Sequence, residues 1–216
     1  MAQTCVPAPK GLSAWTTFDE ALFQGPLRIP GHVGNAVRFD GVKQFFEMPT
    51  SLGFTVGEGD FSIELWVRTT STNTIRNIVD FRSPVPKGWL VYLRRNDAGF
   101  QVADSAHISD VVAQGYSIAD GNWHHIVGVA KRLPPQPLTI YVDGVKRAQA
   151  GKNVTLANLD HTTKLWLARH HRNGYVDREN VYFQGDLDEL SVYRRALAAN
   201  EVAALFKAGR AGKCRK

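Results

Sequence analysis

The sequence is short of cysteine and of long apolar runs. Only two of its 216 residues are cysteine, and neither has another cysteine or a histidine close by, so a zinc site of closely spaced ligands is not expected. No run approaches the roughly 18 apolar residues that a membrane helix needs, and no basic-then-apolar leader opens the chain. We therefore predict no membrane span, and we interpret the opening MAQTCVPAP as a start methionine placed before a mature secreted end.

The two cysteines, Cys5 and Cys214, stand at opposite ends of the chain. A disulfide between them would suit an oxidising compartment and would close a very long loop, for which the chain-entropy model gives about 4–5 kcal/mol. The alternative is a pair of exposed free thiols on frayed ends. We favour the disulfide.

The basic surplus is concentrated near the C-terminus. Five basic residues and no acid lie in residues 207–216, and removing these five charges lowers the net charge from +6 to +1. A nucleic-acid protein is expected to carry its basic residues within the folded body, among aromatic side chains. We therefore predict no nucleic-acid partner, a folded body at residues 10–209 and a solvated basic tail at residues 210–216.

Alternating apolar residues predict a protein made mainly of strands. In residues 61–68, Phe61, Ile63, Leu65 and Val67 share one face. The Asp143-Gly144 pair is the strongest short hairpin signal, because both turn positions favour a positive φ. One helix is expected at residues 198–208, ending at Gly209 and covering one end of the sandwich. Further predicted strands lie at residues 36–39, 44–48, 76–82, 89–94, 99–103, 123–130, 138–142, 145–148, 164–168 and 187–193.

Four segments in order carry a family resemblance. They are FSIELWVRT at 61–69, DGNWHHIVGVAK at 120–131, LTIYVDGVKR at 138–147 and FQGDLDELSVYRRALAANEVAALFKAG at 183–209. Together with the opening CVPAPKGLSAW and the closing AGKC, they resemble the laminin-G-like domains of the concanavalin A-like lectin/glucanase superfamily. The resemblance covers nearly the whole chain, so residues 1–216 are predicted to form a single domain.

The resemblance implies an all-β, two-sheet antiparallel jelly-roll sandwich with one short C-terminal helix. It also implies that the two chain ends lie side by side, which supports pairing Cys5 with Cys214. Members are usually carbohydrate- or protein-binding modules of secreted proteins, although some branches are glycosidases. Since the fold alone does not choose among these functions, three hypotheses stay open: a non-catalytic binding module, a glycosidase-related enzyme and a purely structural module.

The carboxylates do not match a glycosidase. A retaining enzyme needs two carboxylates about 5–5.5 Å apart, and the glucanase branch of the resembling family shows Glu-x-Asp-x-x-Glu. Asp186 and Asp188 could share a strand face, but the third acidic position of that pattern falls on Ser191. We therefore assign no catalytic residue.

A structural calcium ion is the metal that the resemblance makes plausible. Resembling glucanases hold calcium with a carboxylate at the start of the last strand and with backbone oxygens. Asp188 matches that carboxylate, and the Asp40-Gly41 turn could supply a carbonyl at Gly41. The alternative is that Asp188 caps its strand or pairs with an arginine.

His124 and His125 are adjacent on a strand and face opposite ways, so a core or hydrogen-bonding role is expected for them.

Sugar binding would use aromatic faces and planar polar side chains. The segment GWLVYLRRN supplies both types on one strand, and it makes Trp89, Tyr92, Arg94 and Arg95 the candidate ligand residues. Three further tryptophans, at positions 66, 123 and 166, lie in strongly patterned strands and are interpreted as core.

Two segments resemble viral protease recognition sequences. Residues 20–26, EALFQGP, match a picornaviral-type site cut between Gln24 and Gly25. Residues 179–185, ENVYFQG, match a potyviral-type site cut between Gln184 and Gly185. Because loop tips tolerate such grafts, we interpret both as engineered cleavage sites whose partners would be viral-type proteases.

Overall fold

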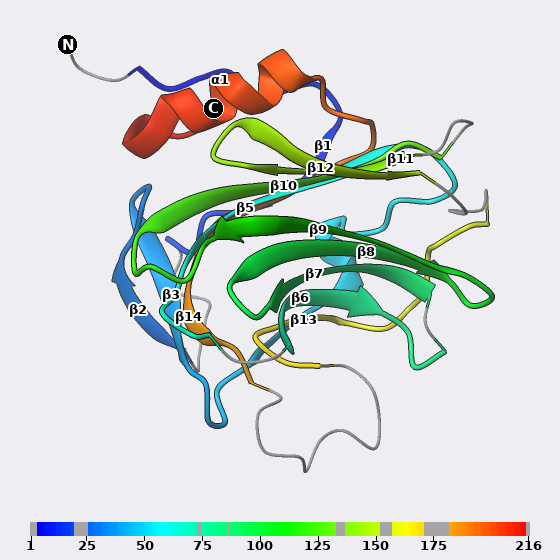
Figure 1. The fold of residues 1–216 in the computed structure, drawn as a ribbon, viewed down its shortest axis with the longest axis horizontal. Helices are drawn as coiled ribbons and strands as arrows, with labels where there is room; N and C mark the ends of the chain where they lie inside the picture. The colour runs from blue at the N-terminus through cyan, green and yellow to red at the C-terminus, as the bar shows by residue number, and fades with distance from the viewer. Residues whose placement is uncertain are drawn as a thin grey trace.

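Two antiparallel sheets pack face to face in the computed structural model (Figure 1). The structure describes residues 4–19, 26–72, 75–85, 87–132, 137–151, 157–170 and 182–214. This architecture is the predicted two-sheet antiparallel sandwich with one short C-terminal helix, so the predicted fold class is confirmed. Within these ranges, no helix is long and apolar enough to cross a membrane.

The larger sheet has eight strands, and β1 pairs with β14 off its main path. Its central strands β5, β10 and β14 each have paired neighbours on both sides. In sheet order, the strands are β12 (Val145–Gly151), β11 (Pro137–Val142), β10 (Trp123–Ala130), β5 (Phe61–Arg68), β14 (Gln184–Tyr193), β3 (Asn35–Asp40) and β2 (Leu27–Pro30), with β1 at Leu12–Thr16.

The smaller sheet has six strands and carries the longest hairpins of the fold. A short 3-10 turn, η1 (Thr50–Leu52), follows its edge strand. In sheet order, the strands are β4 (Phe46–Met48), β13 (Leu165–Leu167), β6 (Ile75–Arg82), β7 (Lys87–Arg94), β8 (Asp97–Asp104) and β9 (Ile108–Ser117).

The main core lies between the two sheets. Phe61, Ile63, Leu65 and Val67 of β5 are all fully buried there, as their alternation predicts. The predicted Asp143-Gly144 hairpin is also confirmed, because it joins β11 to β12 with φ values of 54° and 74°. The alternation along the strands therefore determines which side chains point into the core, and the alternate side chains form the outer face of each sheet.

The outer face of the eight-stranded sheet is covered by α1 (Ala199–Ala208), as Figure 1 shows. The helix packs Val202 and Leu205 against outward side chains of β10, β11 and β14, which makes a second apolar cluster. The helix therefore covers a sheet face, and the prediction that it covers one end of the sandwich is wrong. Trp66 also lies on this outer face, stacked on His32 and Phe206, so it is not in the core between the sheets.

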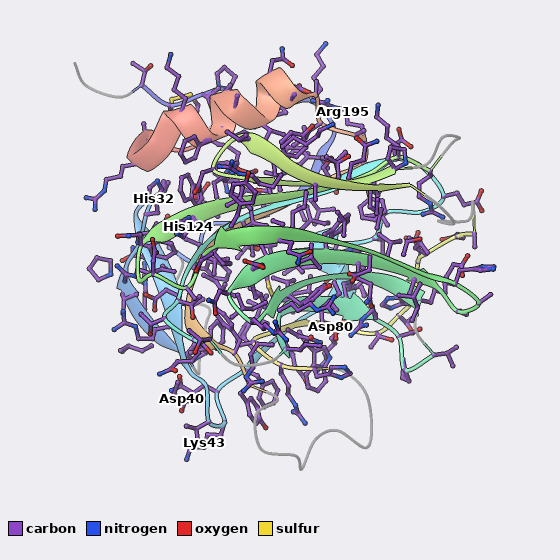
Figure 2. The ribbon with its side chains drawn as sticks, viewed as in Figure 1. His32, Asp40, Lys43, Asp80, His124 and Arg195 are labelled. Carbon is purple, nitrogen blue, oxygen red and sulfur yellow. A yellow bond between two sulfur atoms is a disulfide. The ribbon has the colours of Figure 1, made fainter. Side chains whose placement is uncertain are left out.

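The two chain ends are tied together beside α1. Cys5 and Cys214 form the predicted disulfide, with their Cα atoms 4.9 Å apart, and the sulfur–sulfur bond is drawn in yellow in Figure 2. Val6 accepts a hydrogen bond from the Cys214 amide at 2.9 Å. Lys213 is buried between Glu64 and Glu189, and a second 3-10 turn, η2 (Gly209–Ala211), precedes it. Residues 210–214 are thus part of the fold, which corrects the prediction of a solvated tail that begins at residue 210.

Candidate functional site

The outer face of the six-stranded sheet carries a row of side chains across all six strands. Their chain neighbours Phe81, Val91, Phe100 and Val111 point into the core, so the row points away from it. In ladder order, the row is Glu47 (β4), Trp166 (β13), Asp80 (β6), Leu90 (β7), Gln101 (β8) and Asp110 (β9).

Asp80 is the centre of a fully hydrogen-bonded network in this row (labelled in Figure 2). Arg82 donates from Nε to Asp80 Oδ1 at 2.8 Å and from Nη2 to Oδ2 at 2.9 Å. Asn77 donates its amide to Asp80 Oδ2 at 2.8 Å, and Arg82 also donates from Nη1 to Gln101 Oε1 at 2.7 Å. Such a network fixes the positions of planar polar groups, because each buried group is held by its partner.

Tyr92 extends the polar surface toward β9. Its hydroxyl donates to Asp110 Oδ1 at 2.6 Å, and burial together with this carboxylate raises the tyrosine pKa, so Tyr92 stays a donor. A Cβ at Gly99 would lie 2.3 Å from the tyrosine ring. Gly99 therefore allows the ring to lie flat across β8.

Aromatic rings and an arginine gather where β13 meets β4. Phe45 stacks on Trp166 with ring centroids 5.3 Å apart. The Arg169 guanidinium lies 4.4 Å from the Phe45 ring centre, 4.6 Å from that of Trp166 and 5.8 Å from that of Tyr182. These four half-buried residues place aromatic faces next to the polar row.

A cavity of about 220 Å³ opens on this face. Most of its walls are planar polar or charged groups, which suits recognition of hydroxyl-rich ligands. Its lining residues are Ile75, Asn77, Arg82, Leu90, Tyr92, Arg94, Gln101, Asp110 and His170. We call this cavity, together with the rings of Phe45, Trp166 and Tyr182, the polar face.

The four predicted ligand residues divide into two groups. Tyr92 and Arg94 line the cavity, whereas the exposed Arg95 lies outside its lining, in the β7–β8 turn with a φ of 58°. Trp89 is 0% exposed in the core and donates from Nε1 to the Phe54 carbonyl. Trp89 therefore cannot touch a ligand on the surface, and its prediction is wrong.

Neither the surface position of Trp166 nor the polar row was predicted from the sequence. A strand's alternation gives two faces but does not say which one is covered. One signal was available, since Asn77, Asp80 and Arg82 interrupt the apolar pattern of β6 with polar side chains.

The predicted calcium ligands do not converge. Asp40 is opposite Gln184 in the ladder, so Asp40 lies about four residues, or ~13 Å, from Asp188 along the strands, and Gly41 is one residue further away. Asp188 instead faces the turn at residues 31–34, where the Val33 amide donates to its Oδ2 at 2.8 Å. Burial raises the Asp188 pKa to about 8. Asp188 and Gly41 therefore do not form one ligand set, and the described residues contain no group of three or more His, Cys, Asp or Glu suited to a metal.

A larger cavity of about 680 Å³ lies at the ends of β3, β5 and β14. Its acid Asp186 is bound by Arg38 at 2.7 Å and by Arg68 at 2.7 Å, and Asp40 accepts three amide hydrogen bonds of its own turn. Asp186 and Asp188 share a sheet face as expected, but Asp188 is not part of this lining and accepts the Val33 amide at Oδ2. Among the described residues that line the cavity, the two carboxylates, Asp40 and Asp186, are both held by positioned donors.

The adjacent histidines have the predicted hydrogen-bonding and core roles. His125 is fully buried, with Nε2 3.3 Å from Glu64 Oε1. His124 (labelled in Figure 2) lies between two carboxylates, with Nδ1 2.8 Å from Asp143 and Nε2 3.0 Å from Asp120. The hydrogen bond to Asp143 and then that to Asp120 outweigh burial and raise the His124 pKa.

We expect His124 to make stability pH-dependent. A raised pKa in the folded state stabilises the protein fully below the unfolded pKa of about 6.5, and this contribution is lost as pH rises through the folded pKa. In urea titrations from pH 6 to pH 8, the wild type should therefore lose more unfolding free energy than His124→Gln. His107→Gln, on an exposed turn, is the matched control. Parallel pH slopes for wild type and His124→Gln would contradict the prediction.

Of the two protease-like segments, one lies outside the described residues and one lies partly inside. Gln24 and Gly25 are outside them. Gln184 and Gly185 begin β14 and are paired with Asp40 and Phe39. Phe183 is 0% exposed in the core, and a Cβ at Gly185 would lie 2.7 Å from the Arg68 carbonyl. Phe183 and Gly185 thus have folding roles of their own.

The two antiparallel sheets and the short C-terminal helix define a jelly-roll sandwich. Residues 34–203 match the family described as the concanavalin A-like lectin/glucanases superfamily, and the chain belongs to this family.

Individual relatives extend this comparison. The chain is 26% identical over 175 residues to the non-toxic nonhemagglutinin type E of Clostridium botulinum, covering 81% of this chain but only 14% of that protein. It resembles the binding domain of Paraclostridial Mosquitocidal Protein 1, with a TM-score of 0.73, 18% identity and coverage of 91% of this chain and 52% of that one. It also resembles domain 4 of AbnA, a GH43 extracellular arabinanase from Geobacillus stearothermophilus, in complex with arabinotriose. There the TM-score is 0.64, the identity is 16%, and 89% of this chain and 96% of that domain are covered.

Proposed function

We propose that this chain is a non-catalytic carbohydrate-binding domain of a secreted protein and that its ligand lies on the polar face. The observation that carries the proposal is the row of planar polar groups fixed around Asp80, next to stacked aromatic rings and above a cavity of about 220 Å³. Sugar hydroxyls need donors and acceptors in fixed positions, and the apolar faces of sugar rings pack on aromatic rings.

The relatives support a binding role outside the cell. Two of the similar structures are the binding domain of Paraclostridial Mosquitocidal Protein 1 and an arabinanase domain in complex with arabinotriose, the second from an extracellular enzyme. A non-catalytic role agrees with the carboxylates, since Asp80, Asp186 and Asp188 are each engaged by a positioned donor. A protein ligand remains the second form of the binding hypothesis.

The test is a glycan array followed by titration calorimetry on each sugar retained. We expect Gln101→Ala and Trp166→Ala to weaken binding by about tenfold or more, because one removes a positioned amide and the other a stacking face. Gln149→Ala, on the exposed edge of the other sheet, is the matched control and should bind as the wild type does. Absence of any retained glycan, or equal losses for Gln101→Ala and Gln149→Ala, would sink the proposal.

If the two protease-like segments are engineered cleavage sites, this domain is also a protease-cleavable scaffold. In the folded chain, β14 holds the Gln184–Gly185 bond within a ladder and Phe183 within the core, whereas a protease needs the segment extended in its own cleft. We therefore expect a potyviral-type protease to cut the native protein at least tenfold more slowly than the urea-unfolded chain transferred to protease buffer.

Cutting both sites would give fragments 1–24, 25–184 and 185–216, with the outer two joined by Cys5 and Cys214. Gel analysis with and without reductant measures both points, and equal rates of cutting would contradict the protected placement.

A further inference from the structure

Each carboxylate on the polar face already has a partner. Asp80 is bound by Arg82 and Asn77. Asp110 accepts the Tyr92 hydroxyl. At the edge of the sheet, Glu47 pairs with Lys164 at 2.7 Å. The acids of this face are therefore occupied by the protein itself.

Two arginines on the same face, Arg94 and Arg169, are not paired with an acid in the described ranges. Arg94 is exposed on the cavity wall and makes no ion pair within 4.0 Å in the described ranges, although its charge reaches Asp110 on the same wall. Asp97, opposite Arg94 in the β7–β8 ladder, accepts a hydrogen bond from the Gly115 amide instead. Arg169 stacks on Phe45 and Trp166, and its buried Nε has no hydrogen-bond partner among the described residues.

The two arginines come from the same end of the sheet. Arg94 is opposite Ile75 on β6, and the Ala168 amide bonds to the Ile78 carbonyl of that strand at 2.9 Å. Arg169 and His170 follow directly, and His170 lines the cavity together with Arg94. Since adjacent strands are about 4.8 Å apart, the backbones carrying Arg94 and Arg169 flank β6 at a separation on the order of 10 Å.

We propose that the preferred ligand of the polar face is an anionic glycan, in which a carboxylate or sulfate ester of the sugar pairs with Arg94. This inference rests on the proposed function and narrows it to a class of sugar. A guanidinium forms planar, bidentate hydrogen bonds with carboxylate and sulfate oxygens. The amides of Asn77 and Gln101 then bind ring hydroxyls, and Arg169 adds positive charge at the aromatic edge.

The test uses pairs of oligosaccharides that differ at one residue. In one set, a neutral hexose is compared with the corresponding hexuronic acid. In the other, the same hexose is compared with its sulfate ester. By calorimetry at about 20 mM salt, we expect at least one acidic member to bind about tenfold more tightly than its neutral partner, with the preference shrinking as salt rises. The two sets separate carboxylate from sulfate as the anion recognised.

Arginine variants test whether the preference for acidic sugars depends on Arg94. Arg94→Gln should remove the preference for the acidic over the neutral sugar, and Arg94→Lys should retain part of it. Arg95→Gln, its exposed neighbour outside the cavity lining, makes the same charge change and should keep the full preference. Thermal unfolding of each variant checks the fold.

The outcomes are distinguishable. Equal binding of neutral and acidic sugars, or equal loss in Arg94→Gln and Arg95→Gln, overturns the anionic-glycan inference and leaves the proposed function standing. No binding of any sugar overturns both.

Discussion

Replacing Lys213 with methionine should lower the unfolding free energy by about 3–5 kcal/mol, because it leaves two carboxylates buried without their cation. Lys213 Nζ lies 3.0 Å from Glu189 Oε2 and 3.1 Å from Glu64 Oε1, and its side chain is 2% exposed. Burial alone would lower the Lys213 pKa, yet Glu64 and then Glu189 outweigh burial and raise it. Burial alone would raise the Glu64 pKa, but Lys213 together with His125 and Tyr193 outweighs burial and lowers that pKa to about 2.

Urea titration at pH 7 measures this loss. Lys207→Met on the exposed side of α1 removes the same charge and should cost less than about 0.5 kcal/mol. Adding Glu64→Gln and Glu189→Gln to Lys213→Met should recover most of the stability, since neutral amides carry a smaller burial cost than carboxylates. A Lys213→Met protein as stable as Lys207→Met would show that the cluster contributes nothing.

Removing the disulfide should have an effect of similar size. Cys5 and Cys214 are separated by 209 residues, and the chain-entropy model gives about 5 kcal/mol for closing such a loop. We therefore expect Cys5→Ser combined with Cys214→Ser to lower the Tm by about 10–20 °C. Thermal unfolding with and without reductant measures this change in Tm. The double variant has no thiol left and is the control, since its Tm should not change with reductant.

The disulfide and the lysine are expected to act together. Lys213 adjoins Cys214 and bridges Val6, whose amide donates to the Gly212 carbonyl at 3.0 Å. Once the tether is lost, the segment carrying Lys213 can detach, so Lys213→Met should cost less in the cysteine-free background. Additive losses would contradict this coupling, and a Tm that does not respond to reductant would contradict the predicted role of the disulfide.

Local sequence accounts for most of the fold. The alternation in β5 assigned its four core residues, and the Asp143-Gly144 pair located a hairpin. Strands β1, β2 and β9 were not predicted; of these, β9 mixes Asp110, Gly115 and other polar residues into its run and so lacks a clear period. The helix was predicted within one residue at its start, but the sheet face that it covers was not, because an apolar stripe does not identify its partner.

The candidate site was predictable only in part. Tyr92 and Arg94 were predicted as ligand residues and line the cavity. Trp89 was not separable from them by composition, since it lies on the same strand and only its position in the alternation places it in the core. Asp188 was paired with the wrong turn, because chain separation does not reveal which loop lies across the strand.

The sequence by itself determined the sandwich, its inner faces and the identity of the two cysteines at its ends, because these depend on local period, turn chemistry and residue type. Only the tertiary structure decided which outer face α1 covers and which one presents Asp80, Gln101 and Trp166. It also decided that Lys213 is a buried partner of Glu64 and Glu189, where composition indicated a solvated charge. The physical reason is that covering a face and pairing a charge are contacts between segments far apart in the chain, and no local pattern encodes them.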